Sequence, residues 1–159
     1  MTAARIKSIT CQPLGKDYSE RRDYYIREAV PQATLLAGHG IAGDQKAGRN
    51  PERQLNLLSY EWVQSLAAQG HNSEPGQFGE QMVLAGMAVE ELQPGDRLQL
   101  GGEAVIEITK ARTGCVRLEL VQKDVLQRSG GTIGVLAKVV QGGEIAVGDD
   151  VKVLQVESV

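Results

Sequence analysis

Apolar and polar residues alternate along several short segments of the chain, which is the pattern of half-buried β-strands. The clearest case is 97–108, where Leu98 and Leu100 precede the pair Gly101-Gly102, and alternation resumes after it. A pair of glycines between two alternating segments predicts a β-hairpin. The segment RIKSITCQPL near the start is β-branched and ends at Pro13, so it also predicts a strand.

The last part of the chain also predicts strands. Three strand-like pieces, TIGVLAKVV, EIAV and DVKVLQV, are joined at Gly142-Gly143 and at Gly148-Asp149. Residues 16–31 are charged and predict a loop followed by a strand that ends before Pro31. Two apolar runs, ATLLAG and LNLL, flank a glycine-rich polar stretch. A loop of that length inside a compact domain is usually functional or disordered.

A helical period is clearest over 60–69. Ser59 is a suitable N-cap residue and Gly70 stands where a left-handed terminating residue belongs. The inward stripe of this helix is predicted to be Val63, Leu66 and Ala67. Apolar residues at helical spacing predict a second helix over 117–128, before the sequence Ser-Gly-Gly.

The composition agrees with a small β-protein. The chain has 159 residues, with 19 glycines, one tryptophan, four tyrosines and one phenylalanine, so its core must be mainly aliphatic. Short strands at regular spacing, with two helices inserted, predict a mainly β, barrel-like fold. The length fits one domain, 1–159.

Charge and cysteine content narrow the function classes. A net charge of -3 argues against a general electrostatic grip on nucleic acid. The two cysteines, Cys11 and Cys115, have no C-x-x-C spacing, so neither a disulfide framework nor a zinc knuckle is expected. We find no signal-peptide pattern and no membrane-length apolar run, which predicts a soluble, cytoplasmic protein without a membrane partner.

The sequence GHGIAG at 38–43 matches the glycine spacing of a dinucleotide-binding turn. That fold requires a helix to start there, but the following DQKAGRNPER has no apolar stripe and runs into Pro51. A dinucleotide site is therefore not expected.

Cys115 has an unusual neighbourhood. It follows a predicted strand and precedes a helical stretch, and Lys110, Arg112 and Arg117 lie within five residues of it. A thiol at a helix N-terminus beside cations has a lowered pKa and raised reactivity. The alternative is a buried cysteine that acts as a small hydrophobe. The local sequence leaves both interpretations open.

A second basic group, Lys46, Arg49 and Arg53, lies in the long loop. If the fold brings it to Lys110, Arg112 and Arg117, these cations could together neutralise a phosphate, with glycine backbone N–H groups as further donors.

Six segments resemble, in order, the successive motifs of MOSC domains, a family named for the carboxy-terminal domain of molybdenum cofactor sulfurase. They are GIAGDQKAG, RQLNLLSYE, PGQFGEQMVLAGM, PGDRLQLGGEAVIEIT, RTGCVRLE and VVQGGEIAVGDDV, and they span 40–151. The resemblance implies a β-rich, barrel-like fold that covers the whole chain. It also implies that the family cysteine, which matches Cys115, ligates molybdenum of a pterin cofactor or carries sulfur for it.

The resemblance implies a set of site residues. Cys115 is the expected metal ligand and, with Asp44 and Lys46, the expected catalytic group. Arg49, Arg53, Lys110, Arg112, Gly43 and Gly114 are the residues expected to bind the cofactor. Some relatives reduce N-hydroxylated substrates, so the resemblance implies a molybdenum-dependent oxidoreductase or a sulfurtransferase-like protein.

Two departures from the family pattern weaken the reductase interpretation. Lys46 stands where many members have histidine, and Gln81 stands where many have asparagine. Loss of the imidazole removes a group that transfers protons near neutral pH. The chain also lacks a pyridoxal-phosphate domain and an iron-sulfur domain, so a redox partner or a cysteine desulfurase is expected.

Two other functions stay open. One is a sulfur carrier with a persulfide on Cys115. The other is an anion-binding or interaction domain without catalysis.

Overall fold

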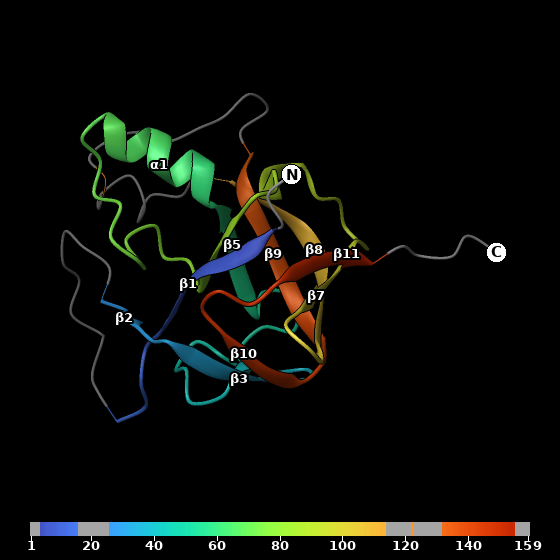
Figure 1. Ribbon diagram of the computed structural model, residues 1–159. Helices are drawn as coiled ribbons and strands as arrows, with labels where there is room; N and C mark the ends of the chain where they lie inside the picture. The colour runs from blue at the N-terminus through green and yellow to red at the C-terminus, as the bar shows by residue number, and fades with distance from the viewer. Residues whose placement is uncertain (1–3, 16–25, 114–121, 123–131, 155–159) are drawn as a thin grey trace.

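The protein is built around a curled sheet of eight strands (Figure 1). The computed structural model describes residues 4–15, 26–113, 122 and 132–154. In spatial order the large sheet contains β11 (Val151–Leu154), β7 (Arg97–Leu100), β8 (Ala104–Thr113), β9 (Thr132–Gln141), β5 (Leu55–Ser59), β6 (Met82–Ala85), β1 (Arg5–Cys11) and β2 (Glu28–Ala29). A three-stranded sheet has the order β10 (Gly143–Ala146), β3 (Gln32–Leu36) and β4 (Gly40–Ile41).

The two ends of the large sheet approach each other. Strand β1 pairs with β6 along one edge, and along its other edge it contacts the turn that leads into β11. The Ile6 N–H donates to the Asp149 carbonyl at 3.0 Å, and the Gly148 N–H donates to the Ile6 carbonyl at 2.8 Å. These bonds join the two sides of the curled sheet over a short stretch, and the predicted mainly β, barrel-like fold is confirmed as a half-barrel.

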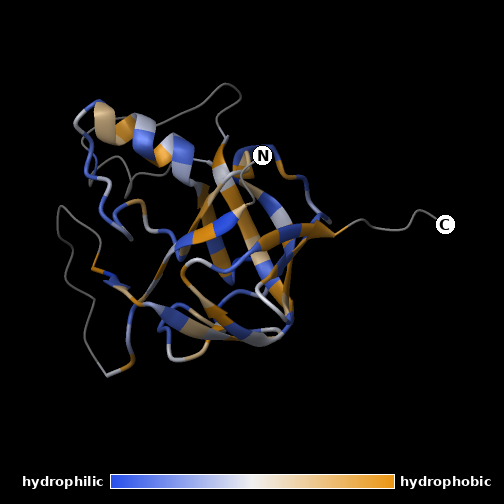
Figure 2. Cartoon of the chain, in the orientation of Figure 1, coloured by the Kyte–Doolittle hydropathy of each residue, from blue (hydrophilic) through white to orange (hydrophobic). Residues whose placement is uncertain are grey.

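The inner face of the half-barrel holds the main core. Alternating residues of the strands meet there, as the banding of hydrophobic and hydrophilic residues along the large sheet shows (Figure 2). The fully buried members include Ile9, Leu57, Leu98, Ile106 and Val135. The predicted hairpin of β7 and β8 is confirmed, with Leu98 opposite Ile106. The three predicted strands of the last segment are also confirmed, as β9, β10 and β11.

A second, smaller cluster lies between the outer face of the sheet and helix α1 (Tyr60–Ala68). Trp62, Val63 and Leu66 are the buried side chains of the helix, and the Trp62 ring lies 5.6 Å from that of Phe78. The predicted N-cap position is confirmed, but one residue of the predicted stripe is wrong. Ala67 is half-buried, and Trp62 takes its place in the stripe. Ser59 is the N-cap residue, but its hydroxyl donates to the Met87 carbonyl and makes no cap hydrogen bond.

A β-bulge in β8 turns its last residues to the outer face of the sheet. Ile108 pairs with Ala137 and Lys110 pairs with Leu136, so Thr109 is an extra residue with no residue opposite it on β9 in the strand register. A bulge of one residue reverses the faces of all side chains that follow. Arg112 therefore leaves the barrel interior and is buried on the outer side.

The remaining described elements are short. A single turn of 3-10 helix, η1 (Val89–Glu91), follows β6. The predicted helix over 117–128 falls outside the described residues, apart from residue 122. No helix in the described part of the chain is long and apolar enough to cross a membrane.

Candidate functional site

A row of four residues, three of them polar, crosses the outer face of the sheet and forms the base of a pocket. Strand register places Leu136 of β9 beside Asn56 of β5, and Gln81 lies next along the row at the start of β6. The Gln81 side-chain oxygen accepts from the Asn56 N–H at 2.9 Å, and the Gln81 carbonyl accepts from the Thr10 N–H of β1 at 2.8 Å. Strands β9, β5 and β1 thus contribute one residue each to this row, and Gln81 directly precedes β6.

Two segments far apart in sequence frame the row. The Gln12 side chain donates to the Ile26 carbonyl at 3.1 Å, which ties the residues before β2 to the end of β1. The Gln12 carbonyl accepts from the Gln45 N–H at 2.8 Å, which ties the long loop to the same residue. Arg27 and the loop over 44–53 therefore meet across the end of β1.

The resulting pocket has a volume of about 370 Å³. It is lined by Gln12, Arg27, Lys46, Arg49, Asn50, Arg53, Asn56, Gly79, Gln81 and Leu136. Lys46, Arg49 and Arg53 are exposed and form a cationic rim. The Arg27 side chain is only 3% exposed and belongs to the floor. The pocket therefore has an open cationic mouth and one buried cation beneath it.

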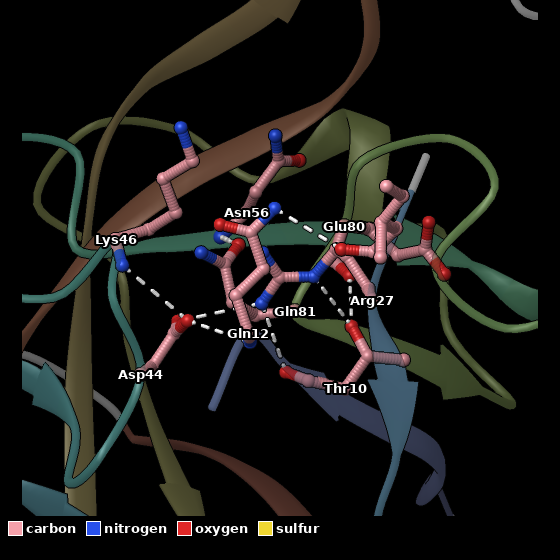
Figure 3. A network of polar contacts seen from close by, with 9 residues as sticks. Thr10, Gln12, Arg27, Asp44, Lys46, Asn56, Glu80 and Gln81 are labelled. Carbon is pink, nitrogen blue, oxygen red and sulfur yellow. Dashed lines mark hydrogen bonds and ion pairs between the residues drawn. The ribbon is translucent and has the colours of Figure 1, made fainter. Parts of the chain in front are cut away.

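Asp44 and Thr10 hold the buried guanidinium of Arg27 in place (Figure 3). Its Nε donates to the Thr10 hydroxyl at 2.8 Å, and its Nη2 donates to the Thr10 carbonyl at 3.1 Å. The same Nη2 lies 3.3 Å from Asp44 Oδ2, and the Asp44 side chain is 0% exposed. A buried carboxylate needs such partners, because an uncompensated charge would be costly to bury.

The second oxygen of Asp44 organises the loop. Asp44 Oδ1 accepts from the Gln12 N–H at 2.9 Å and from the Lys46 N–H at 3.4 Å. Figure 3 shows that the Lys46 side chain points away from this carboxylate. The pKa of Lys46 is lowered, first by burial and then by the charges of Arg49 and Arg27. An anion in the pocket would relieve this repulsion.

The loop itself folds tightly on His39. Gly48 has a φ of +75°, and a Cβ at this position would lie 2.9 Å from His39 Nδ1. Glycine avoids both the strained backbone and the clash, so local packing explains why Gly48 ends the motif GIAGDQKAG.

A buried network supports the floor from below. Glu80, 1% exposed, accepts from the Gly76 N–H at 2.7 Å and the Phe78 N–H at 3.0 Å. Arg112 donates to Asn56 Oδ1 at 2.9 Å and to the Phe78 carbonyl. Burial raises the pKa of Glu80, while these amides and the charge of Arg112 oppose the rise. Together they fix Asn56 and the loop that carries Gly79.

The structure gathers some of the predicted site residues and separates others. Lys46, Arg49 and Arg53 share the pocket, as the sequence suggested, and Asp44 lies under it. Gly43, Lys110 and Arg112 are not among the described residues that line the pocket, and Lys110 is exposed. Gly114 and Cys115 fall outside the described residues, so the predictions that rest on them stay predictions.

Several pocket residues were missed by the sequence reasoning. Gln12 and Arg27 lie outside the six motifs, and Asn56 lies within RQLNLLSYE but was not singled out. Strand pairing and side-chain contacts bring the three together. The charged stretch 16–31 contained Arg27, but nothing in it distinguished this arginine from its neighbours. Among the described residues, no group of three or more His, Cys, Asp and Glu side chains could hold a metal ion.

Fold and site together define a β half-barrel protein with a cation-lined pocket on the outer face of its sheet. Residues 44–152, more than half of the chain, match the MOSC domain family. The chain therefore belongs to the MOSC family.

Solved structures of low sequence identity share the fold. The YuaD protein from Bacillus subtilis has a TM-score of 0.67 and 16% identity, and the match covers 94% of each chain. YiiM from Escherichia coli has a TM-score of 0.67 and 21% identity, covering 97% of this chain and 71% of that one. YiiM from Geobacillus stearothermophilus, at 18% identity, has a TM-score of 0.67. No curated protein sequence matches the chain.

Proposed function

We propose that the protein binds the phosphorylated pterin cofactor of molybdenum in this pocket, with Cys115 as the metal ligand. The observation that carries the proposal is the convergence of Arg27, Lys46, Arg49 and Arg53 on one pocket. MOSC domains are linked to the molybdenum cofactor, and the residues of the pocket fit its two chemical parts.

The rim fits the phosphate. Arginine forks match phosphate oxygens geometrically, and lysine adds a further point charge. Three exposed cations at the mouth would also attract a dianion from solution. In a chain with a net charge of -3, such a local excess of positive charge favours an anionic ligand.

The floor fits the polar edge of a pterin ring. Within the described part of the chain, Nδ2 of Asn56, Nε2 of Gln81 and Oε1 of Gln12 make no hydrogen bond, although each residue lines the pocket. They offer two donors and one acceptor. The pocket volume of about 370 Å³ lies within the usual range of small-molecule sites.

Each group of the chain has a definite task in this proposal. The rim cations bind the phosphate, the floor amides orient the ring, and a Cys115 thiolate supplies a soft ligand that suits a thiophilic metal. When bound, the cofactor supplies a molybdenum centre able to exchange electrons with a small N-hydroxylated substrate. Lys46, as an ammonium at the mouth, would hold a proton near that substrate. A separate redox partner would have to deliver the electrons.

The test is the metal and pterin content of protein purified from a host that makes the cofactor. We expect both molybdenum and pterin fluorescence in the native protein. Cys115→Ser should lose metal, while Arg49→Gln combined with Arg53→Gln should lose both metal and pterin. Lys110→Gln is the matched control, because Lys110 is exposed and does not line the pocket.

Native protein that carries neither metal nor pterin would contradict the proposal. Mass spectrometry after incubation with a cysteine desulfurase would then test for an added sulfur on Cys115, the signature of a sulfur carrier.

A further inference from the structure

We infer that Arg27 is a pre-positioned oxyanion-binding residue on the floor of the pocket, and that Asp44 is its positioning residue. The inference deepens the proposed function and rests on it only for the identity of the oxyanion, a phosphate monoester. It assigns to Asp44 a role different from the catalytic one expected from the sequence.

The hydrogen bonds of Arg27 leave one side of its guanidinium for a ligand. Nε and Nη2 are occupied by Thr10 and Asp44. Within the described residues, Nη1 makes no hydrogen bond, although the side chain is only 3% exposed and lines the pocket. In the described part of the chain, Nη1 of Arg27 is not among the fully buried side-chain atoms that lack a hydrogen-bond partner, so it is not sealed off and its N–H pair can take an acceptor from the pocket. An oxyanion in the pocket supplies that acceptor.

Burial makes this cation different from those at the rim. Exposed charges such as Arg49 are screened by water and by salt. A guanidinium shielded from solvent interacts more strongly with an anion, and salt weakens that interaction less. Arg27 is also fixed before the ligand arrives, so less side-chain entropy is lost on binding.

Asp44 acts through Arg27 and not on the ligand. Its side chain is 0% exposed, it does not line the pocket, and each of its oxygens already has a partner: Oδ2 the guanidinium, Oδ1 the Gln12 and Lys46 amides. It orients Nη2 of Arg27 and, at the same time, holds the loop that carries the rim. A carboxylate in this place also prevents the guanidinium from turning toward bulk water.

The charge balance favours a doubly charged tetrahedral anion. Four cations line the pocket and Asp44 offsets one of them, which leaves an excess of about three positive charges. A phosphate monoester or inorganic phosphate meets that excess better than a monoanionic carboxylate does, and its tetrahedral oxygens can reach floor and rim together.

The test is a titration of the full chain with inorganic phosphate, followed by NMR, at about 0.1 M and about 1 M NaCl, because salt screens exposed charges. Arg49→Gln should weaken binding at low salt, and most of this effect should vanish at high salt. Arg27→Gln should weaken binding about tenfold or more at both salt concentrations, as expected for a buried charged hydrogen bond. In the wild type, phosphate should shift the guanidinium resonance of Arg27.

Asp44→Asn separates positioning from simple electrostatics. Removal of a negative charge beside an anion site should strengthen phosphate binding if only charge matters. If Asp44 positions Arg27, binding should instead weaken several-fold. The double variant Arg27→Gln with Asp44→Asn removes the pair without leaving a buried charge, so it should fold and bind phosphate as weakly as Arg27→Gln.

Three results would overturn the inference: affinity within twofold of wild type in the double variant at high salt, tighter binding by Asp44→Asn, or an unperturbed Arg27 resonance at saturating phosphate. None of them depends on cofactor content. Failure of this inference is therefore distinguishable from failure of the proposed function, in which native protein lacks pterin while phosphate still binds at Arg27.

Discussion

Arg112 offers the sharpest test of how the pocket floor is supported. The sequence suggested that this arginine binds phosphate, whereas the structure shows it buried, donating to Asn56 and to the Phe78 carbonyl beside Glu80. Methionine has a similar length but no charge or donor. We therefore expect Arg112→Met to destabilise the fold as well as the site.

The size of the effect follows from the groups that lose a partner. The buried Phe78 carbonyl and the part-buried Asn56 Oδ1 lose a charged donor, at about 1–3 kcal/mol each. The buried Glu80 carboxyl loses the nearby cation that lowers its pKa. Removing one partner of a buried charge pair costs about 3–5 kcal/mol in total. For a chain of this length that corresponds to a fall of roughly 6–20 °C in Tm.

Urea denaturation followed by the fluorescence of Trp62 is a suitable assay, because the chain has one tryptophan and it packs on Phe78. The loss should be smaller at pH 5 than at pH 8, since Glu80 can then be protonated and needs the cation less. Lys110→Met on the same strand is the control and should cost less than about 0.5 kcal/mol. An Arg112→Met protein as stable as this control at pH 8 would refute the supporting role.

Three further outcomes follow from the described contacts. Gly134→Ala should cost about 3 kcal/mol or more in urea melts, because its Cβ would clash with the Leu57 carbonyl, whereas Gly102→Ala, which meets nothing within 4 Å, should be nearly neutral. Phosphate affinity should fall as pH rises through the lowered pKa of Lys46, and Lys46→Gln should remove this part of the pH dependence; an unchanged profile would contradict it. Because the pKa of Glu80 is raised, this group contributes stability that is present at low pH and is lost as the pH rises above 4.5, its ordinary pKa. In Glu80→Gln the urea midpoint should therefore depend less on pH above 4.5. A wild type that gains stability relative to this variant as the pH rises would contradict the raised pKa.

The fold was largely predictable because many of its core residues lie in segments where apolar and polar residues alternate. Leu98 and Ile106 belong to segments of period two, and both are fully buried inside the half-barrel. Val135 belongs to a run of five buried residues in β9, which the sequence marked as strand-like without alternation. The differences from the predicted pattern that tertiary packing causes were not predictable. Trp62 replaces Ala67 in the helix stripe because Phe78 packs on it from another segment.

The burial of Arg112 could not be predicted for a related reason. Its burial on the outer face depends on the bulge at Thr109, and a bulge reverses faces without a signal in the apolar pattern. From the sequence, Arg112 was simply one more cation near Cys115. Strand register decides whether such a cation faces a ligand or supports a loop.

The candidate site was predictable only where it is contiguous in sequence. Lys46, Arg49 and Arg53 are close together along one loop, so a shared pocket could be expected. Arg27 reaches the same pocket through an ion pair with Asp44, 17 residues away, and through Thr10 on another strand. No local pattern encodes these pairings.

The two departures from the MOSC pattern gain meaning from this arrangement. Lys46 and Gln81 are far apart in sequence, yet both line the pocket, one at the rim and one on the floor. Gln81 also fixes the Asn56 N–H, so its longer side chain serves the sheet as well as the pocket. Both residues thus lie where the proposed cofactor would bind, while the half-barrel around them has the fold of the family. We therefore expect Lys46 and Gln81 to change how the cofactor and a proton are held in the pocket, and not the fold that presents them.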